Sequence, residues 1–350
     1  MKKRIRANLK NRELLQSMIN KTWPRRYDQD DMKVIRHYKH TPSEAKGSTI
    51  TLGNFDGVHK GHKALIEKVV TNAKQHNQPS AVLTFEPHPL SFLKKRNDSF
   101  RITEFRNKFQ IIESLDVDFL FTLDFNKDLA SMEAEEFVKT ILVDNLEVKN
   151  IIVGHDFIFG KGRSGNAELL KELSVKYDYN FIKIDTITDN EDNIDNQEIF
   201  SSTNIRKYIR SGEIEKAANK LGHHFVISGI VRSGQKRGRE LGVPTANLDL
   251  AEYIRPKFGV YIASAKISED SGFMPAAVNI GINPTFNENK EVLEAHILDY
   301  KGDLYDKYIE IRLLKYLRPE KEFNDIEELK SQMNIDITNV GNYFKNIENK

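Results

Sequence analysis

The feature that most constrains the fold is a change in the pattern of the chain at about Ala217. From Met32 to about Asp185, apolar strand candidates alternate with helical stretches. Beyond Ala217, strand candidates are separated by glycine and proline turns without helices between them. Alternation predicts a parallel sheet covered by helices on both faces, whereas closely spaced strands predict an antiparallel sheet or barrel. The sequence therefore predicts two domains of different class, α/β followed by all-β.

The predicted elements follow from apolar runs and their spacing. In the first domain a short strand begins at Met32, and the other strands are expected at 48–53, 80–85, 118–123, 150–154 and 180–185. Helices are expected at 62–76, 104–115, 131–145 and 166–176, then up to Arg210 and over 213–221. Strands of the second domain are expected at 225–231, 259–263, 275–279, 292–298 and 308–314, with a closing helix at 326–333. These elements give domains at 32–214 and 215–350.

Composition limits the classes of protein that fit. With 350 residues the chain is long enough for two domains that each have a core. It contains no cysteine, which excludes a disulfide scaffold and fits a reducing cytoplasm. No apolar run approaches the roughly 18 residues of a membrane span. A net charge of +2 gives no general argument for a nucleic-acid partner.

The first 31 residues differ from the rest in charge. Nine Lys and Arg residues face four Asp and Glu residues there, so this part carries +5 and residues 32–350 carry −3. A basic arm for nucleic acid or a membrane surface fits this pattern, and so does a transit peptide. Because Met32 begins a strand-like segment, we favour a third interpretation, in which residues 1–31 are a non-functional extension or the result of a translation start assigned upstream of Met32.

The ten residues from Gly53 to His62 (GNFDGVHKGH) carry the first functional signal. They lie between a predicted strand and a predicted helix, and a helix N-terminus offers free N–H groups and a partial positive charge to an anion. Glycines let the backbone approach a ligand closely. His59 and His62 add donors that suit a triphosphate whose charge grows as pyrophosphate leaves. The alternatives are a turn with two exposed histidines, and a zinc site that recruits His88.

Two further motifs follow predicted strands of the first domain, at 85–89 and 154–160. Ligands of parallel sheets lie beyond the carboxyl ends of the strands, so we expect these two motifs to lie close to the motif 53–62. A Ser or Thr near 201–203 can cap the helix that runs to Arg210. Ser202 or Thr203 together with Arg206 then places a hydroxyl and a guanidinium on one helix face, which is able to hold a phosphate but is also common in ordinary caps.

Three features stand out in the second domain. The segment 233–242 is a glycine-punctuated basic loop, although a flexible hairpin turn has the same composition. Thr245 and Asn247 are two apart in an extended segment, so both oxygens can face one hard cation such as Mg²⁺; an ordinary turn is the alternative. Strand alternation separates Glu294 from its apolar neighbours, which makes it a candidate general base if its face lines a cavity and an ordinary polar residue if it faces solvent.

Together these residues resemble one family, the bifunctional prokaryotic riboflavin kinase/FAD synthetase. The resemblance covers the chain from about Met32 to the C-terminus, and the order of the motifs makes it specific. The matching segments are 53–62, 85–89, 101–103, 154–160, 201–206, 238–239, 244–247, 279–281, 284–286, 294–299 and 318–320. The departures are Asn107-Lys108, where the family often has Glu-Lys, and residues 1–31, which lie outside it.

For the first domain the resemblance implies a Rossmann-like nucleotidyltransferase that moves AMP from ATP onto FMN, giving FAD and pyrophosphate. His59 and His62 would hold the ATP phosphates and stabilise the transition state. The other implied contacts are Ser202, Thr203 and Arg206 closing over the same phosphates, Gly53, Phe55 and Asp56 shaping the adenylate pocket, and Asp156 and Phe157 near the flavin.

For the second domain the resemblance implies a riboflavin kinase barrel. Glu294 would deprotonate the ribityl 5′-hydroxyl, while Thr245 and Asn247 would hold Mg²⁺ with ATP. The basic loop, with Gly234, Gly238 and Arg239, would cradle phosphates, and Arg318 would belong to a flap near the flavin. The expected partners are riboflavin, FMN and ATP, with no nucleic acid and no membrane.

Two rival functions are kept beside this one. A nucleotidyltransferase that makes a CDP-alcohol or dephospho-coenzyme A fits the first motif, but it does not need the second domain. A flavin-sensing regulatory protein that has lost catalysis is the rival from another class. The presence of His59, His62, Thr245, Asn247 and Glu294 speaks against decay of either site.

Overall fold

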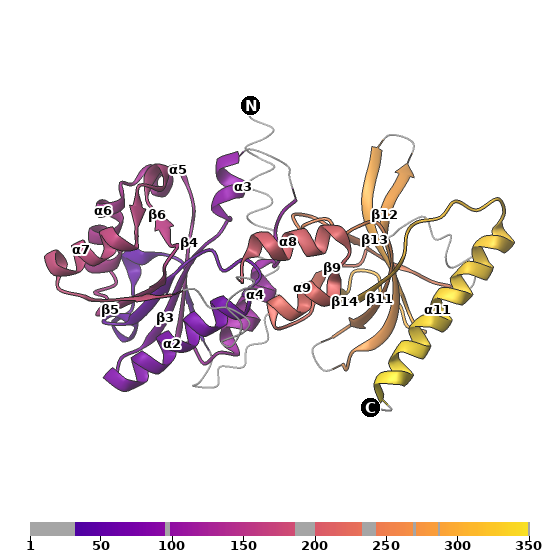
Figure 1. Ribbon diagram of the computed structural model, residues 1–350, viewed down its shortest axis with the longest axis horizontal. Coiled ribbons are helices and arrows are strands. Elements are labelled where there is room, and N and C mark those ends of the chain that lie inside the picture. Colours follow the sequence, from indigo (N-terminus) through magenta and orange to yellow (C-terminus); the bar gives the residue numbers. More distant parts are fainter. Residues whose placement is uncertain are drawn as a thin grey trace, which may run out of the picture.

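The computed structural model describes residues 32–94, 99–185, 200–232, 243–268, 271–285 and 288–348. Figure 1 shows an α/β module beside a β-barrel, with two helices between them and one long helix along the outer side of the barrel. The predicted fold class is confirmed: a parallel sheet is followed by an antiparallel barrel and a terminal helix. The extension 1–31 lies outside the described residues.

The first module is built on a six-stranded sheet in which every neighbouring pair is parallel. Its strands are β1 (Lys33–Ile35), β2 (Thr49–Leu52), β3 (Ser80–Phe85), β4 (Phe119–Leu123), β5 (Asn150–Gly154) and β8 (Asn180–Ile184). Their order in the sheet is β1-β4-β3-β2-β5-β8. From β2 the chain adds β3 and then β4 on one side, and it later adds β5 and then β8 on the other side of β2. Ligands of open α/β sheets bind at such a switch point, beyond the carboxyl ends of the strands.

Helices of the first module cover this sheet, and most lie where the apolar spacing predicts them. The main ones are α2 (Lys60–His76), α4 (Phe105–Glu113), α6 (Ala134–Phe137) and α7 (Ala167–Tyr177). The helix predicted at 131–145 is instead α6 followed by a π-helical turn, η3 (Val138–Val143), in which the Asp144 N–H donates to the Lys139 carbonyl. The short elements that sequence periodicity missed are η1 (Tyr38–His40), η2 (Ser43–Ala45), α3 (Pro89–Lys94), α5 (Lys127–Ser131), β6 (Ile158–Phe159), η4 (Lys161–Arg163) and β7 (Gly165–Asn166).

The second module is a six-stranded antiparallel sheet that nearly closes on itself. Its strands are β9 (Phe225–Ile230), β10 (Ala246–Asp249), β11 (Gly259–Lys266), β12 (Met274–Thr285), β13 (Glu288–Ile297) and β14 (Tyr308–Arg318). They are ordered β10-β13-β12-β11-β14-β9. The Arg232 N–H, just after β9, donates to the Asn247 carbonyl of β10 at 2.9 Å. This bond links the first and last strands of the order.

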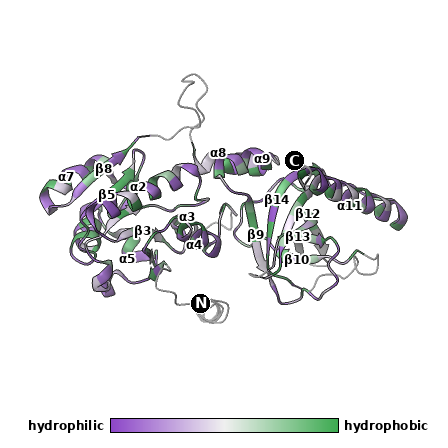
Figure 2. Ribbon diagram, turned by 90° about the horizontal axis from the view of Figure 1, so that it is seen from below, coloured by the Kyte–Doolittle hydropathy of each residue, from purple (hydrophilic) through white to green (hydrophobic). Residues whose placement is uncertain are grey.

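The C-terminal helix α11 (Ile326–Glu348) is much longer than the predicted 326–333. The apolar spacing continues beyond Met333 through Ile337, Val340 and Phe344, which lie on one helix face. Val340 is fully buried. In Figure 2, α7 and α11 change repeatedly between hydrophilic and hydrophobic residues, as amphipathic helices do. Among the described residues, none of the helices has the length and apolar character needed to cross a membrane.

Two helices join the modules, α8 (Ser202–Ser211) and α9 (Ile214–Leu221). Their apolar residues, including Ile205, Ile209 and Leu221, belong to the same buried cluster as the interior of the barrel. The predicted boundary at 214/215 falls just inside α9, after its first residue. Both helices lie between the modules in Figure 1 and pack on the second, whereas Ser202 and Arg206 of α8 contact Asp56 of the first.

Candidate active sites

The first candidate site lies at the switch point of the parallel sheet. The loop 53–59 leaves the carboxyl end of β2 and enters α2, and the loop 154–157 leaves the neighbouring strand β5. Phe55 (φ 47°), Gly57 (φ 89°) and Val58 (φ 36°) have positive φ, so the first loop is sharply turned. At Gly57 a side chain would also meet Leu221 at 3.1 Å, because the α9 end packs against this turn.

His59 and His62 lie together at the N-terminus of α2. Their rings stack with centroids 3.6 Å apart, and Phe55 meets the His62 ring edge-on at 5.2 Å. His59 is the N-cap, and its Nδ1 accepts from the His62 N–H at 3.3 Å. A neutral His59 then carries its proton on Nε2, from which it can donate to an anion. His62 Nδ1 is buried and has no hydrogen-bond partner within the described part of the chain.

Burial keeps this histidine pair neutral. It lowers the pKa of His59 to about 4, although the nearby Asp156 carboxylate opposes the shift. Burial, and then the charge of His59, lower the pKa of His62 well below its ordinary value. The two rings are therefore hydrogen-bond donors without charge near neutral pH. An arriving polyanion would face the positive end of the helix dipole and two imidazoles that are easily polarised.

Asp56 and Arg206 form a second part of this site. The Asp56 carboxylate is buried and accepts from the Ile102 and Thr103 N–H groups at 2.9 and 3.0 Å. Arg206 on α8 pairs with it at 2.5 Å, and Ser202 Oγ donates to the Asp56 carbonyl at 2.8 Å. Ser202 and Arg206 thus hold the 53–59 loop against α8.

Other predicted residues of the first site lie around this centre. Ser201 caps α8, its Oγ accepting from the Asn204 N–H, while Thr203 is exposed in the first turn. Gly53 follows β2, and a side chain there would meet the Phe55 ring at 3.1 Å. Asp156 is exposed after β5, and the Phe157 ring stacks on Phe159 at 5.5 Å. The sequence-predicted residues of the first module are therefore brought to one end of the sheet.

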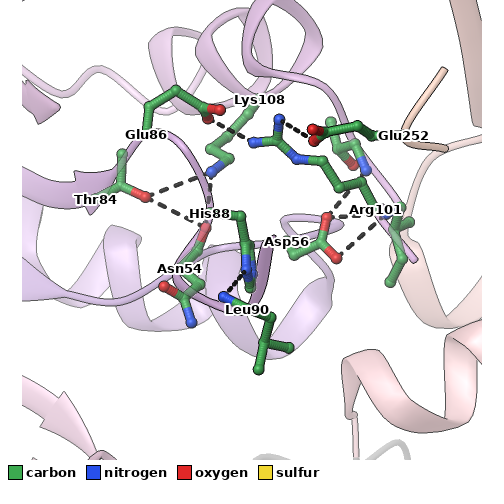
Figure 3. Close-up of polar contacts among 11 residues, drawn as sticks. Asn54, Asp56, Thr84, Glu86, His88, Leu90, Arg101, Lys108 and Glu252 are labelled. Carbon is green, nitrogen blue, oxygen red and sulfur yellow. Dashed lines mark hydrogen bonds and ion pairs between the residues drawn. The ribbon is translucent and has the colours of Figure 1, made fainter. Parts of the chain in front are cut away.

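Lys108 was not predicted as a site residue. Its side chain is fully buried in α4, and its Nζ donates to the Asn54 carbonyl at 2.8 Å and to Thr84 Oγ1 at 3.4 Å (Figure 3). Burial lowers its pKa to about 8. One signal for it was available in the sequence, since Lys108 precedes Ile112 by one helical turn and so lies on the apolar face of its helix.

His88 provides a test of this buried arrangement through pH. Its Nδ1 accepts from the Leu90 N–H at 3.1 Å, and burial lowers its pKa from 6.5 to about 3. Because the unfolded chain takes up this proton below pH 6.5 and the folded chain does not until about pH 3, acid removes stability within that window. We expect the urea concentration at half-unfolding to drop less between about pH 7 and about pH 4 in His88→Gln than in the unsubstituted protein. The exposed His37→Gln is the control, and equal slopes in His88→Gln and the unsubstituted protein would contradict the expectation.

The second candidate site is a cavity of about 330 Å³ between the barrel and α11. Thr245, Asn247 and Glu294 all line it, as the sequence predicts for a shared site. Asn247 is the register partner of Glu294 across β10 and β13, and Asn279 is its partner on β12. Three polar side chains on adjacent strands thus converge on one cavity wall.

Strand alternation places Glu294 as predicted. Leu293, Ala295 and Ile297 are buried in the barrel core, whereas Glu294 and His296 line the cavity. Of the two environments that the sequence left open, cavity or solvent, the structure has the cavity. His296 Nδ1 lies 2.9 Å from the Pro244 carbonyl, which ties the segment before Thr245 to β13.

Arg318 and α11 close the other side of this cavity. The Arg318 guanidinium contacts Asp336 of α11 through Nη2 at 2.7 Å and Nε at 3.0 Å, and both residues line the cavity. Such two-point pairs are directional, so this one fixes the helix over the barrel. Gly281 also lines the cavity, and a side chain there would clash with the Glu320 carboxylate at 1.9 Å. The predicted phosphate loop, with Gly234, Gly238 and Arg239, lies outside the described residues.

For a metal, the two sites differ. Within the described ranges no three His, Asp or Glu side chains are grouped as ligands, and His88 bonds to the Leu90 N–H in place of joining His59 and His62. The second cavity instead offers hydroxyl, amide and carboxylate oxygens from Thr245, Asn247 and Glu294. Oxygen donors of this kind suit Mg²⁺ rather than zinc.

Comparison with known proteins assigns a family to each module. The family model for FAD synthetase matches residues 41–198, and the family model for riboflavin kinase matches residues 221–344. Together the matches include the loops and strands that form the two candidate sites, while α8 lies between them.

Individual relatives match across both modules. A bifunctional riboflavin kinase/FMN adenylyltransferase of Buchnera aphidicola is 40% identical over 89% of this chain and 98% of its own length. The protein of the same name from Escherichia coli K12 is 35% identical over the same shares. A crystal structure of a protein named macrolide-efflux protein, from Streptococcus pneumoniae, superposes with a TM-score of 0.76 at 28% identity, over 89% of this chain and 99% of that one.

Proposed function

Since the chain belongs to the bifunctional riboflavin kinase/FMN adenylyltransferase family, we propose which of its residues carry out each of the two reactions. The enzyme phosphorylates riboflavin to FMN and adenylylates FMN to FAD, with ATP as co-substrate of both steps. We assign adenylylation to residues 32–214 and phosphorylation to residues 215–350. We assign neither reaction to the first 31 residues, and the absence of cysteine supports a cytoplasmic location.

For adenylylation, the stacked His59–His62 pair beside Asp56–Arg206 is the observation that supports the assignment. An FMN phosphate oxygen attacks the α-phosphorus of ATP, and the bond to pyrophosphate breaks. His59 and His62 donate to the phosphate oxygens as the leaving group gains charge, and Arg206 with Ser202 and Thr203 closes over them. Catalysis of this kind needs no side-chain nucleophile and depends on position and electrostatics.

The rest of the first site binds the two substrates. Gly53, Phe55 and Asp56 line the adenylate side, because they form the turn between β2 and α2. Asp156 and Phe157 follow the neighbouring strand β5, so they are placed to contact the flavin end of FMN. Lys108 supports the turn between β2 and α2 by donating to the Asn54 carbonyl.

For phosphorylation, the convergence of Thr245, Asn247 and Glu294 on one cavity is the supporting observation. Glu294 accepts the proton of the ribityl 5′-hydroxyl, whose oxygen attacks the γ-phosphorus of ATP, and ADP leaves. Arg318 holds α11 over the flavin end of the cavity through Asp336. We assign the phosphate-cradling role to the loop with Gly234, Gly238 and Arg239.

Thr245 and Asn247 would hold Mg²⁺ in this cavity, where the ion would shield the charge of the ATP phosphates. Their hydroxyl and amide oxygens fit a hard cation, and the cavity leaves room for phosphates. We expect Asn247→Ala to raise the Mg²⁺ concentration for half-maximal FMN formation about tenfold or more, since losing even a group that only supports a metal ligand costs about that much. Titration of Mg²⁺ at fixed ATP measures this, with the exposed Asn339→Ala as control. An unchanged Mg²⁺ requirement would exclude Asn247 as a ligand.

Incubation of the protein with riboflavin, ATP and Mg²⁺, with separation of the flavins over time, tests the assignment as a whole. FMN is expected first and FAD afterwards. If the protein made FAD from added FMN but made no FMN from riboflavin, the reaction assigned to the second module would be wrong.

A further inference from the structure

The segment 99–103 lies between the modules, and its second-module side pairs with the residues that follow β10. The Arg101 N–H donates to the Glu252 carbonyl at 3.1 Å, and the Ile254 N–H donates to the Arg101 carbonyl at 2.8 Å. These bonds form a short parallel bridge between Arg101 and Tyr253. The backbone of the first module is thereby continuous, through hydrogen bonds, with that of the second.

The other side of the same segment holds the Asp56–Arg206 pair of the first site. The Ile102 and Thr103 N–H groups hold the Asp56 carboxylate at 2.9 and 3.0 Å. The Phe100 carbonyl accepts from Arg206 Nε at 2.9 Å. Both members of the Asp56–Arg206 pair are therefore fixed by the backbone of residues 100–103, so a shift of this backbone would move both.

The Arg101 side chain joins carboxylates of the two modules (Figure 3). This side chain is 7% exposed, and its guanidinium pairs with Glu86, after β3, at 2.5 Å and with Glu252 at 3.3 Å. Burial opposes its charge, but Glu86 and then Glu252 outweigh burial and raise its pKa. A planar fork can hold two carboxylates in fixed directions, which a lysine ammonium cannot do.

The helix that follows the segment is fixed to the barrel as well. The Arg106 guanidinium lies 4.4 Å from the centre of the Tyr308 ring, and Asn107 Nδ2 donates to Ser228 Oγ at 3.3 Å. The next residue, Lys108, points back to the Asn54 carbonyl in the nucleotide turn. Residues 99–108 therefore form a joint with contacts on both sides along its length.

We propose that Arg101 is a positioning residue for adenylyl transfer, holding segment 99–103 between Glu86 and Glu252 so that Arg206 is correctly placed over the phosphates. The proposal deepens the proposed function and rests on the role assigned there to Arg206. It also makes Glu252, a residue of the kinase module, part of the support of the other active site. The adenylylation site is in this sense completed by the second module.

Steady-state kinetics of the full-length protein test the proposal. We expect Arg101→Met to lower kcat/KM for ATP in FAD formation by about tenfold or more, with both a raised KM and a reduced kcat, since small displacements at a transfer site are costly. Arg101→Lys keeps the charge and should recover part of the loss. Glu252→Gln should give a smaller loss, because this carboxylate is 55% exposed. FMN formation by the same samples reports the fold of the second module and should stay unchanged.

Two comparisons separate the proposal from a general loss of stability and from an error in the assigned role of Arg206. Glu147→Gln breaks an exposed ion pair with Lys46 in the first module and should leave FAD formation unchanged. In an Arg206→Lys background, Arg101→Met should cost little more, because it acts through Arg206. Losses that multiply, equal losses of both activities, or full activity of Arg101→Met beside a defective Arg206→Lys would overturn the proposal. Full activity of Arg206→Lys and Arg206→Ala would instead overturn the role of Arg206, and the proposal with it.

Discussion

Glu294→Gln is expected to abolish FMN formation while FMN is still converted to FAD. The substitution keeps the shape and polarity of the side chain but removes the carboxylate that we propose as the base for the ribityl hydroxyl. General bases contribute about a hundredfold to ten-thousandfold, so the rate of riboflavin phosphorylation should fall by that factor. Separate assays from riboflavin and from FMN, with flavins resolved by chromatography, measure the two steps in one preparation.

The matched control is Glu310→Gln, on strand β14 of the same barrel and outside the residues that line the cavity. It should leave both rates unchanged. If Glu294→Gln kept more than about a tenth of the phosphorylation rate, the general-base role would be wrong, because a missing base costs more than that. If it lowered FAD formation from FMN equally, the division of the two reactions between the modules would be wrong.

His62→Ala is expected to have the reverse effect, a loss of FAD formation with FMN formation intact. His62 stacks on His59 at the N-terminus of α2, so its removal takes away one of the two proposed phosphate donors and the support of the other ring. Loss of one preorganised donor costs about a hundredfold to a thousandfold in kcat. The measurement is kcat for FAD formation from saturating FMN and ATP.

His76→Ala serves as the control, because His76 is exposed at the opposite end of the same helix. The position of the loss matters as much as its size. A variant in which KM for ATP rose while kcat stayed unchanged would show that His62 binds the ground state and the transition state equally, against the role proposed for it.

Much of the architecture could be predicted because it depends on local periodicity. The buried strands of the first module are apolar runs bounded by polar loops, and the split of Glu294 from Leu293 and Ala295 follows from the two-residue period of a strand. The turn 53–59 lies between β2 and α2 as predicted, because a helix N-terminus after a glycine-rich turn has a distinct composition, although α2 begins at Lys60, two residues before the predicted start.

The parts that could not be predicted depend on contacts between distant segments. Nothing in the sequence around Arg101 indicates that Glu252, 151 residues later, lies beside it. The burial of Lys108 and the pairing of Arg318 with Asp336 likewise depend on how one element packs on another. The length of α11 was within reach of the sequence, since its apolar spacing continues past Met333, but the predicted helix ended there.

Helix α8 has a consequence for the inheritance of the two activities. On one of its sides Arg206 pairs with Asp56 of the first module, while Ile205 and Ile209 belong to the core of the barrel. A gene fragment that ends before α8 would encode the first module without Arg206. A fragment that ends after α8 would separate this helix from the barrel and expose apolar surface on both. A cut on one side of this helix breaks the Asp56–Arg206 pair, and a cut on the other side opens the buried cluster that α8 shares with the barrel.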